Sequence, residues 1–418
     1  MSLSRREVLK GASHVSLAAV ASPALLTATE SASAAPVTPI ALPDRANYRF
    51  RGIHLNAAYT HPTGIRTTEA SRRYIDARMT DPGRNWPAAN ARNDAVALFA
   101  RLINADAGEI AVVPSTLEGE NLVASALGLG PDRGVVTDSL HYDASLAFYG
   151  EMAKRGMPLK TLAPRDHAID YDELERAITP QTALVAISHV SSWTGHQHDL
   201  KRICDIAHAK GALVYADVIQ SAGGIPLDVR ESGVDFCCAG MYKWLQGEFG
   251  AAFLYVRADR LAALKRVQLG WRGLKSYQPH FMPGDPPGPP EGTWELGSDT
   301  ASIFEVSTAN WSGLATTAGA LQYIHDIGID AIARHREPML ERLQDALPRA
   351  GWASWTPRDH QGPALVFAKP GARALYRDAL DKAEIYTTLY PNRIRISPSV
   401  HNSMDDIERL IAILSRPA

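Results

Sequence analysis

Short apolar runs of strand length alternate with amphipathic stretches of helix length between about residues 66 and 260. The apolar runs predict seven strands, at EIAVVPS, GVVTDSL, LKTLAP, TALVAISHVS, ALVYADV, VDFCCAGM and AAFLYV. Four amphipathic stretches predict helices that end near a glycine or a basic turn, at ENLVASALGLG, DASLAFYGEMAKRG, DLKRICDIAHAKG and RADRLAALKRV. Continuous apolar strands separated by helices predict an α/β fold, in which a mostly parallel sheet is covered on both faces.

The pattern changes after this region. A loop rich in proline and glycine, PHFMPGDPPGPPEG, occupies residues 279–292. Beyond it we expect a long helix, a further helix, two short strands and a last helix, with the long helix over 306–326, the strands near 364–368 and 393–397, and the last helix from 404. The tail therefore predicts a smaller α+β domain.

The first residues have the order of a twin-arginine export signal. Arg5 and Arg6 precede a short run rich in alanine and serine, and an Ala-x-Ala cleavage site follows at Ala32 and Ala34. Because Pro23 interrupts that short run, we expect no membrane anchor in the mature chain, which the twin-arginine machinery would deliver to the periplasm or beyond. The expected division is a signal peptide over 1–34, a large domain over 66–305, and a small domain formed by 35–65 and 306–418.

Composition excludes some classes of partner. The chain has 43 Lys+Arg and 45 Asp+Glu, and no basic block follows the signal, so we expect no nucleic-acid partner. Three cysteines do not make a disulfide framework, and no metal site is expected. Cys204, Cys237 and Cys238 lie in helical or apolar patterns and are expected to be buried core thiols.

Polar side chains follow several predicted strands, at the edge of the sheet where proteins of this class bind ligands. Ser115 and Thr116 begin a helix, where hydroxyl and N–H groups can bind a phosphate, although helix capping explains such residues more often. His141 follows the next strand, where a lone histidine is usually structural. Asp217 ends an apolar strand and needs a cationic partner there. Lys243 follows the next strand, either as an ion-paired lysine or as an amine that can form a Schiff base.

One ligand accounts for this ordered set of side chains. Pyridoxal 5′-phosphate (PLP) has a phosphate, an aromatic ring with a basic nitrogen, a phenolic oxygen and an aldehyde. The expected roles are phosphate binding by Ser115 and Thr116, stacking by His141, protonation of the ring nitrogen by Asp217, a bond from Gln220 to the phenolic oxygen, and attachment of the aldehyde to Lys243.

The sequence resembles the class V aminotransferase family of PLP fold type I, which includes cysteine desulfurases, kynureninase and isopenicillin N epimerase. HVSSWTG resembles the family's H-V-S-N-x-x-G, with Ser192 where Asn is common, and DVIQ resembles its D-x-x-Q. AGMYKWL resembles the S/C-Y-K-Y-L form, which implies that Tyr242 also contacts the phosphate. WELGSD resembles F-E-x-G-T, which implies a homodimer in which Ser298 reaches the phosphate of the neighbouring subunit.

The end of the chain extends the resemblance to the substrate. RISPSVHNSMDDIERL matches the family's C-terminal R-x-S segment, which implies that Arg395 binds the substrate carboxylate through a two-donor contact. Because Ser192 replaces an asparagine, we expect Asn56 in HLNAAYTHPTG to take over part of its role. Cysteine desulfurases carry a nucleophilic cysteine upstream of this arginine, and AEIYTTLYPNRIR has none. We therefore expect an enzyme of the family that is not a cysteine desulfurase.

The resemblance implies a PLP-dependent enzyme that acts at the α-carbon of an amino acid or aminoacyl substrate. Together with the export signal, it is similar to the exported PLP enzymes that tailor the siderophore pyoverdine, which implies a glutamyl group as substrate. An amino-acid epimerase or lyase of the isopenicillin N epimerase type is the alternative. A PLP-fold binding protein without catalysis is an alternative of another class.

Replacing both Arg5 and Arg6 with lysine is expected to leave the uncleaved chain in the cytoplasm, because the arginine pair is the recognised part of a twin-arginine signal. Cell fractionation followed by immunoblotting measures this. Periplasmic delivery of the double-lysine variant, with normal cleavage after Ala34, would contradict the interpretation of the N-terminus.

Overall fold

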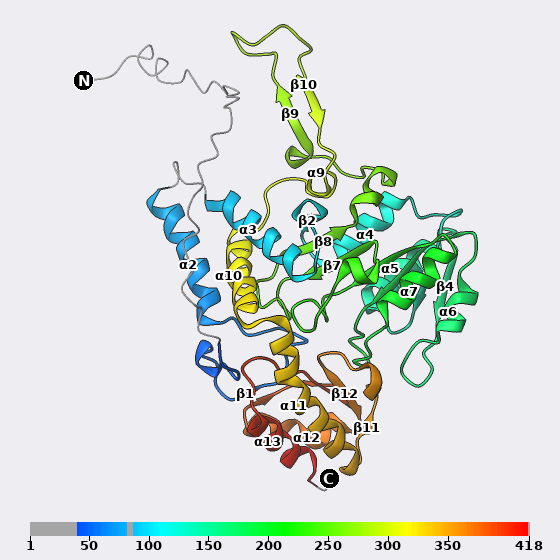
Figure 1. Cartoon of the computed structure of the whole chain (residues 1–418), viewed down its shortest axis with the longest axis vertical. Helices are drawn as coiled ribbons and strands as arrows, with labels where there is room; N and C mark the ends of the chain where they lie inside the picture. Colours follow the sequence, from blue (N-terminus) through cyan, green and yellow to red (C-terminus); the bar gives the residue numbers. More distant parts are fainter. Residues whose placement is uncertain (1–39, 82–86, 417–418) are drawn as a thin grey trace. The chain divides into compact units, whose positions relative to one another are not determined.

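The computed structural model describes residues 40–81 and 87–416, so the twin-arginine pattern and its cleavage site lie outside the described residues. All seven strands expected from the apolar runs are present and form one sheet (Figure 1). Their order is β2-β8-β7-β6-β5-β3-β4, with bounds β2 Ile110–Val113, β3 Gly134–Asp138, β4 Leu159–Leu162, β5 Thr182–Ser188, β6 Leu213–Asp217, β7 Phe236–Gly240 and β8 Ala252–Val256. Strands β4, β3, β5, β6 and β7 are parallel, and β8 pairs antiparallel with β7 and β2. The predicted α/β fold with a mostly parallel sheet is therefore confirmed.

Helices surround this sheet and continue into the C-terminal part of the chain. Their bounds are α2 Ile65–Thr80, α3 Pro87–Leu102, α4 Thr116–Leu127, α5 Asp143–Ala153, α6 Tyr171–Ala177, α7 Leu200–Ala209, α8 Val229–Ser232, α9 Thr300–Phe304, α10 Trp311–Ile327, α11 Ile329–Arg349, α12 Ala372–Lys382 and α13 Met404–Leu414. No helix in the described part of the chain is long and apolar enough to span a membrane.

Successive strand residues point to opposite faces of the sheet, and both faces are covered. On one face, Val136 and Val214 belong to a buried cluster with side chains of α3, α7 and α10. On the other face, Val135 and Tyr215 cluster with side chains of α4 and α5. Burial on both faces explains why these strands are continuous apolar runs in the sequence.

The three cysteines follow the same rule. Cys237 belongs to the first cluster and its neighbour Cys238 to the second, while Cys204 of α7 packs into the first. All three are buried free thiols, as expected, and burial raises the pKa of each.

A second, four-stranded sheet lies in the C-terminal part, in the order β11-β12-β15-β14. Its strands are β11 Ala353–Ser354, β12 Leu365–Ala368, β14 Thr388–Leu389 and β15 Arg393–Ile396, and α11, α12 and α13 share its core. The two strands and the last helix expected there are confirmed. Strand β1 (Ile53–His54) pairs in parallel with β13 (Ile385–Tyr386), which brings the segment before α2 to this part. The predicted boundaries between the domains stay a prediction.

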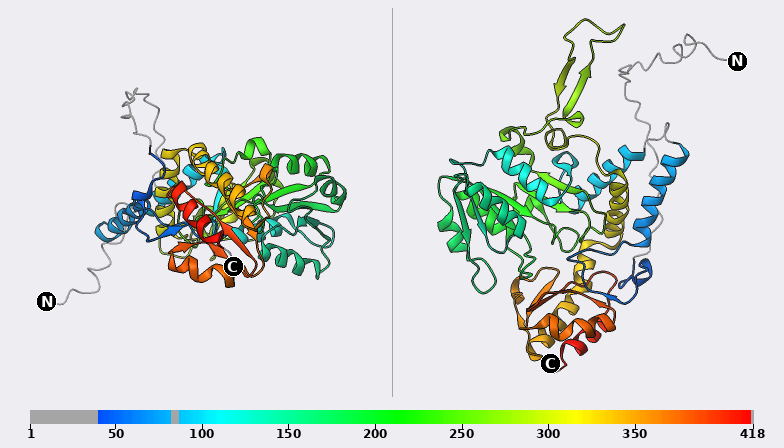
Figure 2. Two further views of the ribbon diagram at one scale, coloured as in Figure 1. Left: turned by 90° about the horizontal axis from the view of Figure 1, so that it is seen from below. Right: turned by 180° about the vertical axis from the view of Figure 1, so that it is seen from behind.

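The loop rich in proline and glycine joins two strands that the sequence pattern did not indicate. Strands β9 (Leu274–Gln278) and β10 (Thr293–Leu296) pair antiparallel, and the hairpin extends away from the seven-stranded sheet (Figures 1 and 2). Every residue of β10 is exposed, so neither face carries the buried alternation that marks a strand in a sequence.

Two helix predictions need correction. The long helix begins at Trp311 rather than at 306, because the Asn310 side chain accepts a hydrogen bond from the N–H of Gly313 and caps it there. The helix expected in RADRLAALKRV is a short 3₁₀ helix, Ala258–Ala263. In a 3₁₀ helix, side chains three residues apart align, which suits Arg257 and Arg260 because both reach the same carboxylate.

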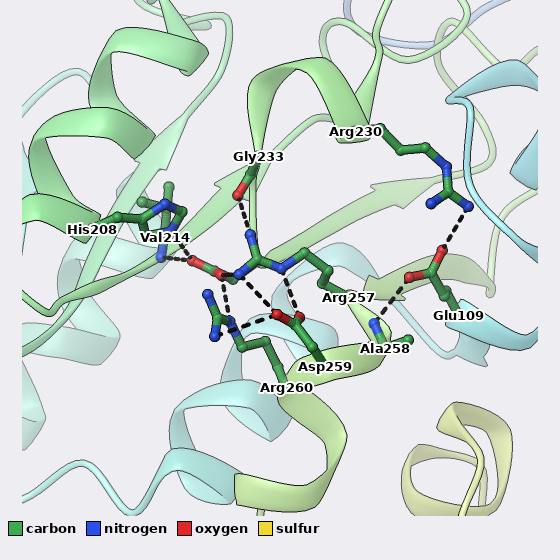
Figure 3. Close-up of polar contacts among 10 residues, drawn as sticks. Glu109, His208, Val214, Arg230, Gly233, Arg257, Ala258, Asp259 and Arg260 are labelled. Carbon is green, nitrogen blue, oxygen red and sulfur yellow. Dashed lines mark hydrogen bonds and ion pairs between the residues drawn. The ribbon is translucent and has the colours of Figure 1, made fainter.

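That carboxylate belongs to Asp235, whose side chain is fully buried just before β7. Figure 3 labels its partners His208, Val214, Arg257 and Arg260. The carboxylate accepts hydrogen bonds from the N–H of Val214 at 2.7 Å and from Arg260 Nε at 2.8 Å. Its oxygens also lie 2.8 Å from His208 Nε2 and 3.0 Å from Arg257 Nη2. Asp235 therefore connects β6, α7 and the chain after β8. It supports β6, which ends at Asp217, and β7, which is followed by Lys243.

Replacing Asp235 with asparagine is expected to destabilise the protein by about 2–4 kcal/mol, because it removes the charge that pairs with two arginines in a buried setting. The matched control is Asp259→Asn, since the Asp259 side chain is 61% exposed and its ion pair is expected to contribute little. Urea unfolding followed by tryptophan fluorescence measures both. Equal midpoints for the two variants would contradict the role of Asp235.

Candidate active site

Two neighbouring cavities meet at Lys243. The first has a volume of about 440 Å³ and is called the strand-end cavity; its walls include Ser115, Thr116, Asp217, Gly240, Tyr242 and Lys243. The second has a volume of about 370 Å³ and is called the arginine cavity; its walls include Ala58, Ser192, Trp193, Tyr390, Arg393 and Arg395. Tyr142, Tyr242, Lys243 and Phe249 line both cavities. A ligand in either cavity can therefore reach the Lys243 amine.

Lys243 is a partly buried amine just beyond β7. Its pKa is lowered to about 8, first by burial and then by the charge of Arg395, while the charge of Asp217 acts in the opposite direction. The Nζ atom lies 5.7 Å from the centroid of the Tyr242 ring. A lysine with this pKa is a substantially stronger nucleophile near neutral pH than an exposed lysine, because more of it is uncharged.

Asp217 is a buried carboxylate at the end of β6, with 5% of its surface exposed. Its Oδ1 atom accepts a hydrogen bond from the N–H of Ile219 at 2.9 Å. Burial raises its pKa, while His141, the backbone bond and Lys243 act in the opposite direction. None of the ion pairs within residues 40–81 and 87–416 involves Asp217. The wall of the strand-end cavity therefore offers a carboxylate to a ligand that carries a cationic N–H group.

The N-terminus of α4 closes the same cavity. Ser115 caps the helix by accepting a hydrogen bond from the N–H of Glu118 at 3.1 Å, and Thr116 Oγ1 accepts one from the N–H of Gly240 at 2.8 Å. A Cβ atom at Gly240 would lie 2.9 Å from Ile219 Cδ1 and 3.2 Å from Thr116 Oγ1, so a larger residue there would have to displace the end of the Ile219 side chain. The unpaired N–H groups of a first helical turn, beside two hydroxyls, suit a phosphate.

Arg395 lies on β15 and lines the arginine cavity, with 5% of its surface exposed. Nη1 donates to the Ser192 carbonyl at 3.2 Å and Nη2 to Thr388 Oγ1 at 3.4 Å, while the buried Nε has no partner. Burial lowers the pKa of Arg395. Within the described ranges no carboxylate forms an ion pair with it. A buried guanidinium with an unused donor suits a substrate carboxylate.

Asn56 does not line either cavity, and its side chain contacts Thr388. The Thr388 hydroxyl donates to Asn56 Oδ1 and accepts from Arg395, so Asn56 acts on the guanidinium through one intervening side chain. Ser192 lines the arginine cavity and contacts Arg395 through its carbonyl. The expected roles of Asn56 and Ser192 in holding the ligands stay predictions.

Two further predicted residues lie beside the cavities without lining them. His141 is fully buried, with Nδ1 2.9 Å from Ser188 Oγ and Nε2 2.9 Å from Glu120 Oε1. The amide of Gln220 donates to the Ala58 carbonyl and accepts from Trp244 Nε1, each at 3.0 Å. Their expected roles in stacking and in binding a ring oxygen stay predictions.

Tyr242 and Ser298 occupy different surroundings. The Tyr242 ring stacks on Phe249 with ring centroids 4.5 Å apart and lines both cavities. Ser298 is exposed just after β10, outside the strand-end and arginine cavities. Its expected contact with a neighbouring subunit stays a prediction.

Sequence reasoning missed several wall residues, of which Trp193, Tyr390 and Arg393 are the most informative. Trp193 directly follows Ser192 after a predicted strand, so its position at the sheet edge could have been inferred. Arg393 stands two residues before Arg395 on one strand, and the alternation R-I-R-I indicates that both arginines share a face. Within residues 40–81 and 87–416, no group of three or more potential metal ligands is suited to hold a metal ion.

Comparison with known proteins shows which family this chain resembles. The family described as Aminotransferase class-V matches residues 76–410. The chain is 28% identical over 352 residues to the uncharacterized aminotransferase YcbU of Bacillus subtilis, covering 82% of this chain and 88% of that protein. It is 30% identical over 330 residues to a probable cysteine desulfurase of Halobacterium salinarum, covering 73% of this chain and 76% of that protein.

Solved structures show the same fold. A cysteine desulfurase from Thermococcus onnurineus NA1 superposes with a TM-score of 0.76 at 22% identity, covering 87% of this chain and 94% of that one. The cysteine desulfurase CsdA from Escherichia coli has the same TM-score at 22% identity, covering 88% and 96%. The fold and the cofactor expected from the sequence agree with these comparisons.

The expectation that the chain is not a cysteine desulfurase is wrong by these comparisons, because several of its relatives and structural neighbours carry that name. The expectation rests on one side chain missing from one loop. The similarity, in contrast, extends over about three quarters of the chain for the Halobacterium protein. A single position is a weaker guide than similarity over most of the chain.

Replacing Glu120 with glutamine is expected to lower the pKa of His141. Burial lowers that pKa, but the charge and hydrogen bond of Glu120, together with the charges of Asp217 and Asp138, raise it overall, so the imidazole should lose its proton at lower pH in the variant. An NMR pH titration of the His141 ring measures this, with Ser145→Ala as the control that keeps the charge of Glu120. An unchanged pKa in Glu120→Gln would contradict the pairing.

Proposed function

Because the chain belongs to the class V aminotransferase family, we propose that it is a PLP-dependent enzyme that acts at the α-carbon of an amino acid or aminoacyl group. The observation that carries this proposal is the position of the Lys243 amine at the junction of two cavities, one suited to a phosphate and a cationic ring, the other to a carboxylate.

The residues of the strand-end cavity fit PLP. The first turn of α4, with Thr116, would hold the phosphate, and the buried Asp217 would hold a protonated ring nitrogen. Lys243 would hold the aldehyde carbon, since its lowered pKa leaves a larger fraction of the amine uncharged near neutral pH than in an exposed lysine. When bound, PLP withdraws electrons from the substrate's α-carbon, so that a bond to that carbon breaks more readily.

The chain's own residues supply the rest of the chemistry. Arg395 binds the substrate carboxylate and thereby fixes the α-carbon close to the Lys243 amine. The Nζ atom of Lys243 would take a proton from the α-carbon or return one to it, and its pKa of about 8 matches that task. The carboxylate of Asp217 would stabilise a protonated ring nitrogen.

Several reactions share this first step, and the relatives favour one to be assayed first. Seven of the similar proteins carry the name cysteine desulfurase, which makes L-cysteine the first substrate to test. Epimerisation or elimination on another amino acid is the second candidate and follows from proton transfer by the same Lys243. A catalytically inactive binding protein is disfavoured, because Arg395 lines the second cavity with an unused donor that binding of PLP alone does not need.

Two features of the biological setting are also proposals. The order of Arg5, Arg6, Ala32 and Ala34 supports export by the twin-arginine pathway, which would allow the chain to fold around PLP before it crosses the membrane. A siderophore glutamyl group as substrate stays a prediction of the sequence resemblance.

A homodimer is supported by the apolar side chains that the hairpin exposes, including Tyr277, Phe281 and Trp294.

Lys243→Ala is expected to abolish covalent retention of PLP. The parent should carry a visible absorbance band that borohydride fixes on Lys243, as peptide mass spectrometry would show, and the variant should have neither. Lys201→Ala is the matched control, since Lys201 is an exposed lysine paired with Asp205 on α7. A variant that still carries borohydride-fixed PLP at another lysine would refute the assignment.

The rate of PLP uptake by the apo chain is expected to rise with pH and to level off above about pH 8, because only the uncharged Lys243 amine attacks an aldehyde. Asp217 raises the pKa of Lys243, so Asp217→Asn should move this rise to lower pH. Stopped-flow absorbance measures both profiles. Identical profiles in the parent and the variant would contradict the coupling between the two groups.

A further inference from the structure

Strand β15 presents two arginines on one face. In the sequence Arg393-Ile394-Arg395-Ile396, both isoleucines are fully buried in the core of the C-terminal part, so both arginine side chains point to the opposite face. Both arginines line the arginine cavity. Their Cα atoms are two residues apart, which in a strand corresponds to about 6.5–7 Å. The alternation that builds the core therefore also builds a pair of cations in the cavity wall.

The guanidinium of Arg393 is held by aromatic rings. Its Cζ atom lies 4.0 Å from the centroid of the Trp193 ring and 4.0 Å from that of the Tyr390 ring. Contact with ring faces fixes the plane of a guanidinium and leaves the N–H groups at its edge available to bind a planar anion. In the described part of the chain, no hydrogen bond or ion pair involves the Arg393 side chain.

The charges around the cavity are unbalanced. Lys243, Arg393 and Arg395 are its basic wall residues, and Asp143 is its acidic one. The Oδ1 atom of Asp143 accepts a hydrogen bond from Trp193 Nε1 at 2.6 Å, and none of the ion pairs in the described ranges joins Asp143 to Arg393. Arg393 in turn lowers the pKa of Arg395, as expected for two neighbouring cations. A single α-carboxylate bound at Arg395 leaves the charge of Arg393 without an anionic partner.

We propose that the substrate is a dicarboxylic amino acid, whose α-carboxylate binds Arg395 and whose side-chain carboxylate binds Arg393. This inference rests on the proposed function, because it takes the Lys243 amine as the point where the α-carbon is held. Two carboxylates on one small molecule satisfy both arginines at once, and an isosteric amide in the side chain satisfies only Arg395. Arg393 is therefore the residue that determines side-chain specificity, and Trp193 and Tyr390 are the residues that position it.

The test compares substrates that differ only in the second charge. PLP-loaded parent protein is titrated with L-glutamate, L-glutamine, L-aspartate, L-asparagine and L-cysteine, and the dissociation constants are read from the change in the absorbance of bound PLP. The parent is expected to bind at least one of the two acids about tenfold or more tightly than the matching amide, as one charge-assisted contact would give.

Arg393→Gln is expected to abolish the preference for the acid while binding of the amide changes little. Arg393→Lys should keep part of the preference, because an ammonium retains the charge without the two-donor edge. Arg342→Gln is the matched control, since Arg342 is paired with Glu408 and lies outside both cavities. The control should bind all five amino acids as the parent does.

The outcomes separate this inference from the proposed function. If the parent does not retain PLP at Lys243, or if no amino acid changes the absorbance of bound PLP, the proposed function fails. If PLP is retained but the parent binds the amides or L-cysteine as tightly as the acids, only the present inference is overturned. A preference for the acid that survives in Arg393→Gln also overturns it.

Discussion

The electrostatic setting of the Lys243 amine is the constraint on which the rest of the site depends. The amine lies between a buried carboxylate, Asp217, and a buried guanidinium, Arg395, and burial together with Arg395 brings its pKa to about 8. Neither Asp217 nor Arg395 forms an ion pair with another side chain in the described ranges. Buried charges without partners are costly to keep, so a site that keeps two of them is built for ligands that carry the opposite charges.

The fold supplies these groups from distant parts of the chain. Asp217 and Lys243 follow neighbouring parallel strands, whose carboxyl ends meet at one edge of the seven-stranded sheet. Arg395 comes from the other sheet, on a strand whose alternate residues form the core of the C-terminal part. Residues 56–60 also contribute to the site. Ala58 and Tyr59 line the arginine cavity, and Asn56 forms a parallel β-bridge with Ser397. Two hydrophobic cores therefore anchor the strands that supply the charged groups around the reactive amine.

Much of this architecture could be predicted from the sequence, and the reasons are physical. Strands buried on both faces leave continuous apolar runs, and for this reason all seven strands of the large sheet could be located. The ends of those strands gave Asp217 and Lys243 as site residues. The exposed hairpin β9–β10 could not be found, because a strand without a buried face has no hydrophobic period.

The hydrogen-bond partners of the site residues could not be predicted from the sequence either. The sequence indicates that His141 and Gln220 follow site strands, but it cannot indicate that Glu120 and Trp244 occupy their polar atoms. The aromatic support of Arg393 depends on Trp193 and Tyr390, which are about two hundred residues apart in the chain. The exclusion of a cysteine desulfurase was wrong for a different reason, since one missing loop residue was given more weight than the similarity along the whole chain.

The measurement that tests this account most directly is a crystal structure of the protein grown with PLP. The account predicts continuous density from Nζ of Lys243 to the cofactor, with the ring nitrogen at hydrogen-bonding distance from the Asp217 carboxylate and the phosphate at the first turn of α4. Density for PLP in another pocket, or a ring nitrogen that faces away from Asp217, would contradict the assignment of the strand-end cavity.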